Sequence, residues 1–85
     1  MSYEVRILPT AGKAIDSLPK SDRRRVLLRI LSLREEPRPH GCQKLRGFED
    51  VYRVRTGDYR IVYRIADREL LVLIVRVGHR REVYR

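Results

Sequence analysis

The stretch Tyr52-Arg53-Val54-Arg55-Thr56-Gly57-Asp58-Tyr59-Arg60-Ile61-Val62-Tyr63 decides the fold of this chain. Apolar and polar residues alternate on both sides of Gly57-Asp58, a pair that is typical of a two-residue hairpin turn with glycine where φ is positive. If these two residues form the turn, Thr56 pairs with Tyr59, and the pairing continues back to Tyr52 opposite Tyr63. The stretch is therefore predicted to be an antiparallel β-hairpin.

The predicted pairing sorts the side chains of the hairpin by charge, because directly paired residues share a face of a sheet. One face carries the mainly apolar set Tyr52, Val54, Ile61 and Tyr63. The other face carries the arginines Arg53, Arg55, Arg60 and Arg64. Like charges opposite one another destabilise a sheet. A hairpin that tolerates them is expected to meet a polyanion on this face.

The composition of the chain also favours an anionic partner. The 85 residues carry a formal net charge of +9. Arginine predominates, and the only lysines are Lys13, Lys20 and Lys44. The planar guanidinium group binds phosphate through two parallel hydrogen bonds, whereas lysine acts as a point charge. Nucleic acid or an acidic protein therefore fits better than the alternative, a plain solvated basic surface.

Other features narrow the setting in which the protein acts. No apolar run approaches the roughly 20 residues of a membrane span, and no basic segment has the apolar stripe of a membrane-surface helix, so no membrane partner is expected. The first five residues lack the basic and apolar regions of a signal peptide. Cys42 is the only cysteine, which excludes an internal disulfide and a cysteine-based metal site. We expect one cytoplasmic domain over residues 1–85.

A strand and two helices are predicted before the hairpin. Residues 3–8 alternate like a strand that ends at Pro9. Thr10 is expected to cap a short helix, and Pro19 to lie in the first turn of a second helix that ends near residues 35–36. The second helix is predicted to bury the residues Val26, Leu27, Ile30, Leu31 and Leu33.

The rest of the chain completes a sheet. Residues 38–47 are expected to form a loop, and Asp67-Arg68 a second turn. Leu70 to Val77 is almost entirely aliphatic, which is typical of a strand that is buried on both faces and central in its sheet. The element order β-α-α-β-β-β predicts an α+β fold, with a helical hairpin packed on one face of a mostly antiparallel four-stranded sheet.

The end of the last strand is expected beside the Gly57-Asp58 turn. The register is open by a residue or two, and a slip would exchange the two faces of that strand. In either register, residues 78–80 come near Arg60. The predicted cluster occupies a concave, uncovered face that suits a phosphodiester, and its members are Arg53, Arg55, Arg60, His79, Arg80, Arg81 and Tyr84.

Four segments together resemble the RelE toxins of bacterial type II toxin–antitoxin systems, and the resemblance runs from Tyr3 to Tyr84. The segments are Lys44-Leu45-Arg46-Gly47, Tyr52-Arg53-Val54-Arg55, Gly57-Asp58-Tyr59-Arg60-Ile61-Val62-Tyr63 and Val77-Gly78-His79-Arg80-Arg81-Glu82-Val83-Tyr84. The resemblance implies a toxin that enters the ribosomal A site and cuts mRNA there without a metal or cofactor. It also implies an acidic, RelB-like antitoxin that wraps around the toxin, and operator DNA as a ligand of the complex.

The resemblance also implies roles for single residues. Arg53 and Arg55 fall where the best-known family members have two lysines. Arg60 falls on the arginine of the third strand, Arg80 on the arginine after the last strand, and Tyr84 on the near-terminal tyrosine. These five form the implied catalytic set. The implied RNA-binding residues are Lys44, Arg46, His79 and Arg81.

Metal-free RNA cleavage requires stabilisation of the phosphate, which gains negative charge, and transfer of a proton. Arginine is suited to the first of these two tasks. Arg55, Arg60 and Arg80 can each hold two phosphate oxygens. None of them can take the proton of the 2′-hydroxyl, because a guanidinium group stays protonated at neutral pH. Tyr84 is the first candidate for the proton acceptor and His79 the second, with a merely phosphate-facing or solvated His79 as the simpler alternative.

Two other functions stay open on the sequence alone. One is a ParE-like inhibitor of DNA gyrase, and the other is a non-catalytic basic RNA-binding module. A shared fold does not decide between them. The retained arginines and Tyr84 favour the nuclease, whereas the missing lysines keep the inhibitor open.

Overall fold

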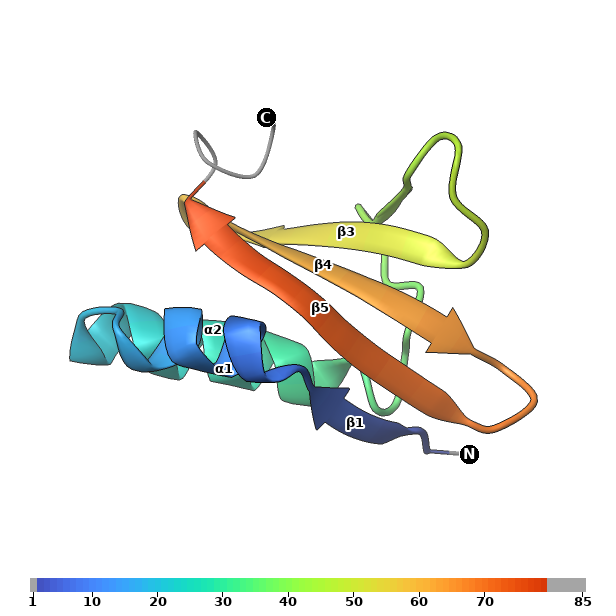
Figure 1. Ribbon diagram of the computed structural model, residues 1–85, viewed down its shortest axis with the longest axis horizontal. Helices are drawn as coiled ribbons and strands as arrows, with labels where there is room; N and C mark the ends of the chain where they lie inside the picture. Colours follow the sequence, from blue (N-terminus) through green and yellow to red (C-terminus); the bar gives the residue numbers. More distant parts are fainter. Residues whose placement is uncertain (1, 80–85) are drawn as a thin grey trace.

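A computed structural model describes residues 2–79 of the chain (Figure 1). Two helices lie on one face of a five-stranded sheet whose strand order is β1-β5-β4-β3-β2. The helices are α1 (Pro9–Asp16) and α2 (Lys20–Ser32). The strands are β1 (Glu4–Ile7), β2 (Gln43–Lys44), β3 (Val51–Thr56), β4 (Tyr59–Ala66) and β5 (Leu71–His79). The predicted α+β fold, a helical hairpin on one face of a mostly antiparallel sheet, is confirmed.

The predicted number of strands is wrong by one. β2 lies within the expected loop at residues 38–47 and pairs antiparallel with β3, with Gln43 opposite Arg53 and Lys44 opposite Tyr52. A strand of two residues leaves no alternation in the sequence, so the pattern could not reveal it. At the other edge of the sheet, β1 runs parallel to β5.

The β3–β4 hairpin has the predicted register, from Thr56 opposite Tyr59 to Tyr52 opposite Tyr63. Gly57 in the turn has a φ of +59°, a left-handed conformation in which any other side chain costs free energy. A Cβ at this position would also lie 2.7 Å from a guanidinium nitrogen of Arg25, on α2. Because this atom is the movable end of a long side chain, the positive φ of the turn is the main reason for glycine here.

The core lies between the helices and the sheet. Its largest fully enclosed side chain is Tyr63, whose hydroxyl donates a hydrogen bond to the carbonyl oxygen of Pro37 at 2.7 Å. From the helical side, the core receives Ala11, Ile15, Val26, Ile30 and Leu33. From the sheet it receives Val54, Ile61, Ile65, Val72, Ile74 and Val77. The apolar face predicted for the hairpin is thus the face that the helices cover.

Two leucines of α2 are not buried as predicted. Leu27 is 37% exposed and Leu31 is 52% exposed. The helix buries a narrow stripe at residues 26, 30 and 33, and each of these two leucines follows a stripe residue, about 100° farther around the helix. Apolar spacing predicted the helix correctly but overstated the width of its buried face.

The predicted helix ends also shift. α1 begins at Pro9, whose missing N–H suits the first helical position, so Thr10 lies inside the helix instead of capping it. Pro19 precedes α2 in an extended conformation, and α2 ends at Ser32. The Leu33 N–H then bonds to the Ile30 carbonyl in a tighter turn, which stops the helix before residues 35–36.

A β-bulge interrupts the pairing of β4 with β5. Tyr63 lies opposite Ile74, whereas Val62 lies opposite Arg76, so Val75 is an extra residue on β5. Such a residue exchanges the two faces of a strand from that point on. β5 is an interior strand as predicted, but it is not buried on both faces, because Arg76 is exposed.

A polar cluster joins four distant segments at the end of the sheet where the turn between β4 and β5 lies. The Arg38 guanidinium donates two hydrogen bonds to the Asp67 carboxylate, at 3.1 and 2.8 Å, and one to the Tyr52 hydroxyl at 3.1 Å. The Tyr3 hydroxyl donates to the same carboxylate at 2.8 Å. The hydrogen bonds from Arg38 and then Tyr3 lower the pKa of Asp67 to about 2.

The Asp67→Asn variant is expected to unfold at a lower urea concentration than the wild type at pH 7 and to be less sensitive to acid. The pKa of Asp67 is lowered from 3.8 to about 2 by folding. Its carboxylate therefore stabilises the fold fully above pH 4 or so, and this contribution is lost as the pH falls towards 2. Urea unfolding followed by circular dichroism between pH 7 and pH 2 measures both effects. Asp58→Asn, at the exposed hairpin turn, is the control, and an acid sensitivity of Asp67→Asn equal to that of the wild type would contradict the assignment.

Candidate nucleic-acid interface

The sheet face opposite the helices carries arginines in two neighbouring rows across the strands. In the row beside the turn, Arg55 lies opposite Arg60, and Arg60 lies opposite Gly78. The next row consists of Arg53, Val62 and Arg76, in that order from β3 to β5. We call these two rows the arginine face.

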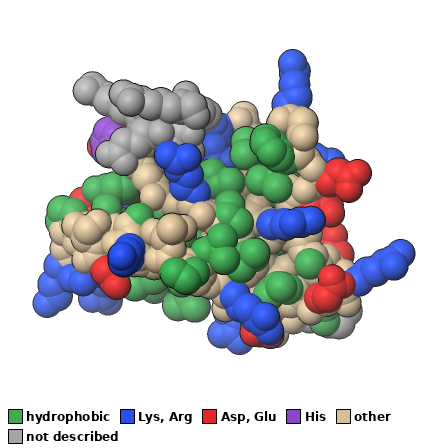
Figure 2. Space-filling model, in the orientation of Figure 1, with side chains coloured by type: hydrophobic (Ala, Val, Ile, Leu, Met, Phe, Trp, Pro, Cys, Tyr) green, Lys and Arg blue, Asp and Glu red, His purple; other side chains and the backbone are tan. Residues whose placement is uncertain are grey.

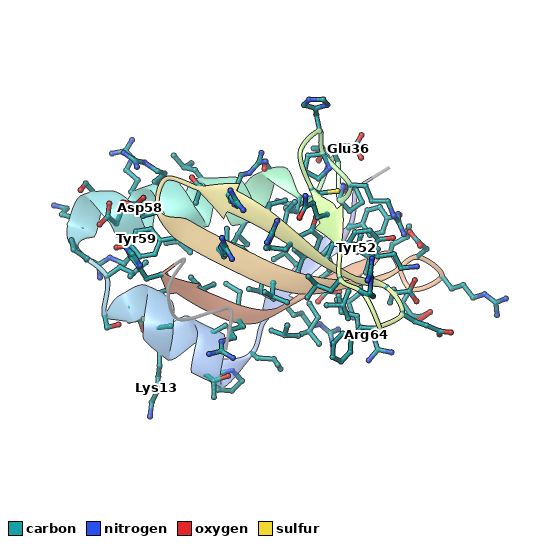
Figure 3. The ribbon with its side chains drawn as sticks, turned by 90° about the horizontal axis from the view of Figure 1, so that it is seen from above. Lys13, Glu36, Tyr52, Asp58, Tyr59 and Arg64 are labelled. Atoms are coloured by element: carbon teal, nitrogen blue, oxygen red, sulfur yellow. The ribbon has the colours of Figure 1, made fainter. Side chains whose placement is uncertain are left out.

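The arginine face is seen from above in Figure 3, where the helices lie beyond the sheet. Asp58 and Tyr59 mark the turn end of the β3–β4 hairpin, and Tyr52 and Arg64 mark the other end. Nitrogen-tipped side chains stand on the strands between these two ends. The predicted grouping of arginines on one face of the hairpin is thus present.

The expectation of an uncovered face is wrong for two of these arginines. Arg53 is only 5% exposed and Arg60 only 7% exposed, whereas Arg55 is open to solvent. One cause is the unpredicted strand β2, because the side-chain oxygen of Gln43 accepts a hydrogen bond from Nη2 of Arg53. Gln43 of β2 thus helps to hold the Arg53 guanidinium group in place.

Burial and charge both act on Arg53. Burial lowers its pKa, and the neighbouring Arg55 lowers it further. A guanidinium group nevertheless stays protonated at neutral pH, because its ordinary pKa is above about 12. A charge that is fixed and partly removed from water acts more strongly on an approaching anion than a fully solvated one does. The arginine face is therefore suited to hold phosphate.

The predicted RNA-binding residues before the hairpin lie at its edge. Lys44 is in β2 opposite Tyr52, so it shares the face of Tyr52 and not that of Arg53. Arg46 lies in the following loop, where residues 44–49 line a shallow hollow of about 480 Å³. Phe48 in this loop is 62% exposed, and the sequence reasoning did not select it.

The structure separates His79 from the arginine face. His79 pairs with Tyr59, so both lie on the helix side of the sheet. Its ring packs edge-to-face on the Tyr59 ring at a centroid distance of 5.9 Å. The Tyr59 hydroxyl donates a hydrogen bond to Asp22 of α2 at 3.0 Å. His79 does come near the turn as predicted, but on the opposite face from Arg60.

Three predicted site residues, Arg80, Arg81 and Tyr84, lie outside the described residues. Among the residues that the structure describes, Arg53, Arg55 and Arg60 come together as predicted, and Gly78 lies beside Arg60. The residue that the sequence reasoning missed is Arg76. The available signal was the single charge that interrupts the aliphatic run of β5.

A second surface lies on the other side of the molecule. A mainly apolar groove of about 630 Å³ runs between β1, an edge strand, and α2, and Leu27, Leu31 and Arg34 contribute to its lining. The exposed leucines continue along α2 beside Arg23 and Arg24. Basic side chains are not confined to one face, since Figure 2 shows Lys and Arg projecting at several separate places on the outline of the molecule. The groove is mainly apolar, with Glu4 and Arg34 in its lining and Arg23 and Arg24 farther along α2.

Within residues 2–79, no three His, Cys, Asp or Glu side chains gather closely enough to hold a metal ion. Neither of the helices in this range is long and apolar enough to cross a membrane.

Comparison with known proteins gives a consistent result. Residues 5–84 match a family model described as the ParE toxin of the type II toxin–antitoxin system parDE. Toxin RelG of Mycobacterium tuberculosis is 34% identical over 90 aligned positions, which cover 100% of this chain and 99% of RelG. The mRNA interferase toxin RelE of Escherichia coli K12 is 32% identical, with 99% of this chain and 92% of RelE covered.

Solved structures agree with the sequence comparisons. A chain of the archaeal RelE–RelB complex from Pyrococcus horikoshii OT3 superimposes with a TM-score of 0.84 at 35% identity, covering 98% of this chain and 100% of that one. A chain of the intact E. coli RelBE toxin–antitoxin complex gives a TM-score of 0.81 at 28% identity, covering 92% and 96%.

Replacement of Arg55 by threonine is expected to stabilise the protein by about 0.5 kcal/mol at low ionic strength, because it removes the like charge opposite Arg60. The gain should disappear in about 1 M NaCl, where charges are screened beyond roughly 3 Å. Arg64→Thr is the matched control, because Arg64 is also an exposed arginine of this hairpin. It lies in β4 opposite the uncharged Val51. Urea unfolding at both salt concentrations measures the difference. Equal effects of the two substitutions at low salt would show that the facing charges cost nothing.

Proposed function

This chain belongs to the ParE toxin family of type II toxin–antitoxin systems and is a RelE-type toxin, and on that premise we propose that it cuts mRNA in the A site of the ribosome. The observation that carries the proposal is the arginine face, where Arg53 and Arg60 are enclosed and Arg55 stands beside them. Three guanidinium groups on one face suit an RNA phosphate that gains charge as it reacts. The reaction would take place in the cytoplasm, where the ribosomes are.

The proposed reaction needs no metal ion. The 2′-hydroxyl of one nucleotide loses its proton as its oxygen bonds to the adjacent phosphorus. The bond from phosphorus to the 5′-oxygen breaks, and this oxygen takes up a proton, so the products are a 2′,3′-cyclic phosphate and a 5′-hydroxyl. Arg55 and Arg60 stabilise the extra negative charge of the phosphate, together with Arg80. Arg53 is the inner member of the set, held by its contact with Gln43. Holding the reacting groups in line supplies a further large part of the acceleration.

Proton transfer falls to a residue other than these arginines. A guanidinium group cannot accept the 2′-hydroxyl proton at neutral pH. Tyr84 is our first candidate for this role, because an arginine-rich site would make a phenol more acidic. His79 is the weaker candidate, because its ring packs on Tyr59 on the other side of the sheet from Arg60.

A RelB-like antitoxin is the proposed protein partner. The solved relatives from P. horikoshii and E. coli are complexes of RelE with RelB. In this chain the groove between β1 and α2 presents exposed Leu27 and Leu31 next to Arg34. An acidic segment with apolar side chains would match the exposed leucines and the arginines of α2, and it would order as it binds.

A ParE-like function is the second candidate, because the matching family model is described as the ParE toxin. In that case the protein would inhibit DNA gyrase without cutting RNA. The two candidates differ in what the arginine face must do, since only the nuclease needs charge aimed at a reacting phosphate. A DNA supercoiling assay beside the RNA assay separates them.

Arg60→Ala is expected to lower the rate of mRNA cleavage by about 10²–10³, the usual cost of removing one charge-stabilising donor. The measurement is primer extension on ribosomes programmed with a defined mRNA, which also maps the cut to the A site. Arg68→Ala is the control, an exposed arginine in the turn after β4, and should cut like the wild type. Intact mRNA with the wild-type protein, together with inhibited supercoiling by gyrase, would replace the nuclease by the ParE-like function.

Leu31→Asp is expected to weaken binding of the cognate antitoxin by at least about 30-fold while leaving the cleavage rate within twofold, because a charge would enter an apolar interface. Isothermal titration calorimetry with the antitoxin gives the first number, and the ribosome assay gives the second. Phe48→Asp is the matched control, an equally exposed apolar residue outside the groove. Unchanged antitoxin affinity in Leu31→Asp would remove the groove from the interface.

A further inference from the structure

We propose that Arg76 is an additional contact to the RNA backbone, placed on the arginine face by the β-bulge in β5. The contact lies beside the reacting phosphate and serves binding, whereas Arg55 and Arg60 serve the reaction itself. This inference rests on the proposed function, but part of its test does not require cleavage.

The bulge is what turns Arg76 towards the arginine face. Tyr63 lies opposite Ile74, and an unbroken ladder would therefore place Val75 opposite Val62. Arg76 would then share the face of Ile61, which is fully enclosed in the core. The extra residue Val75 instead brings Arg76 opposite Val62 and returns Val77 to the core, where it is 5% exposed. Bulges often re-aim one side chain in this way next to functional sites.

The position of Arg76 extends the arginine face by one strand. Directly across β4 from Arg76 are Val62 and then Arg53. Arg60 is a diagonal neighbour, at a typical distance of about 7–8 Å, because the residue opposite Arg60 is Gly78. Three adjacent strands span roughly 10 Å from β3 to β5, which is wider than one phosphate group. The face is therefore wide enough for Arg55 and Arg76 to contact neighbouring phosphates of one strand of RNA.

Exposure gives Arg76 a different task from the inner arginines. Arg53 and Arg60 are nearly enclosed, whereas Arg55 and Arg76 are open to solvent. An exposed arginine at this strand position can reach a polyanion that lies on the arginine face, through a charged hydrogen bond to a phosphate oxygen.

The test compares Arg76→Ala, Arg76→Lys and Arg68→Ala with the wild type. In the ribosome assay, Arg76→Ala should raise the toxin concentration for half-maximal cleavage about tenfold, the usual value of a hydrogen bond to a charged group, and change the maximal rate less than twofold. Arg76→Lys should restore most of the affinity, and Arg68→Ala should match the wild type. Circular dichroism confirms that each variant is folded.

A second arm measures binding alone, with a fluorescent single-stranded 2′-O-methyl oligoribonucleotide that cannot be cut. Arg76→Ala should reduce the slope of log affinity against log salt by about 0.7, the loss of one phosphate contact. If the wild type binds this RNA and the slope falls, but ribosomal mRNA stays intact, the contact stands and the proposed reaction fails. If Arg76→Ala equals Arg68→Ala in both arms, or lowers only the maximal rate, or if the wild type neither cuts nor binds RNA, the proposal is overturned.

Discussion

The rest of the structure depends on the alternation of side chains in the β3–β4 hairpin. The register that buries Ile61 and Tyr63 under the helices forces Arg53, Arg55 and Arg60 onto the opposite face. Burial of the apolar side stabilises the same two strands that the arginines push apart. Burial of the apolar side thus offsets the repulsion between the arginines, and the same strand register produces both.

The sequence predicted those parts of the fold that repeat over several residues. The hairpin register and the order of the long elements followed from alternation, helical spacing and one turn signal, Gly57-Asp58. β2 and the bulge at Val75 could not be predicted, because each involves one or two residues and depends on what lies across the sheet. The outward position of Leu31 is similar, since the width of a buried stripe is decided by the partner surface and not by the helix.

The candidate site followed the same division. Grouping Arg53, Arg55 and Arg60 required only the pairing of adjacent strands. Their burial required β2 and its Gln43, which no pattern indicated. The sequence could not decide which side chains of β5 face the helices, because a shift of one residue in register exchanges the two faces. The bulge at Val75 introduces such a shift inside the strand. For this reason His79 lies away from the arginine face and Arg76 lies on it.

The parallel pairing of β1 with β5 has a consequence for the synthesis of the protein. Tyr3 bonds to Asp67, 64 positions later, and β1 has no neighbour in the sheet except β5. A nascent chain that reaches only to β4 has no partner for β1, so this contact between distant segments forms only after β5 has been made. The strand that is synthesised first is therefore among the last to join the sheet.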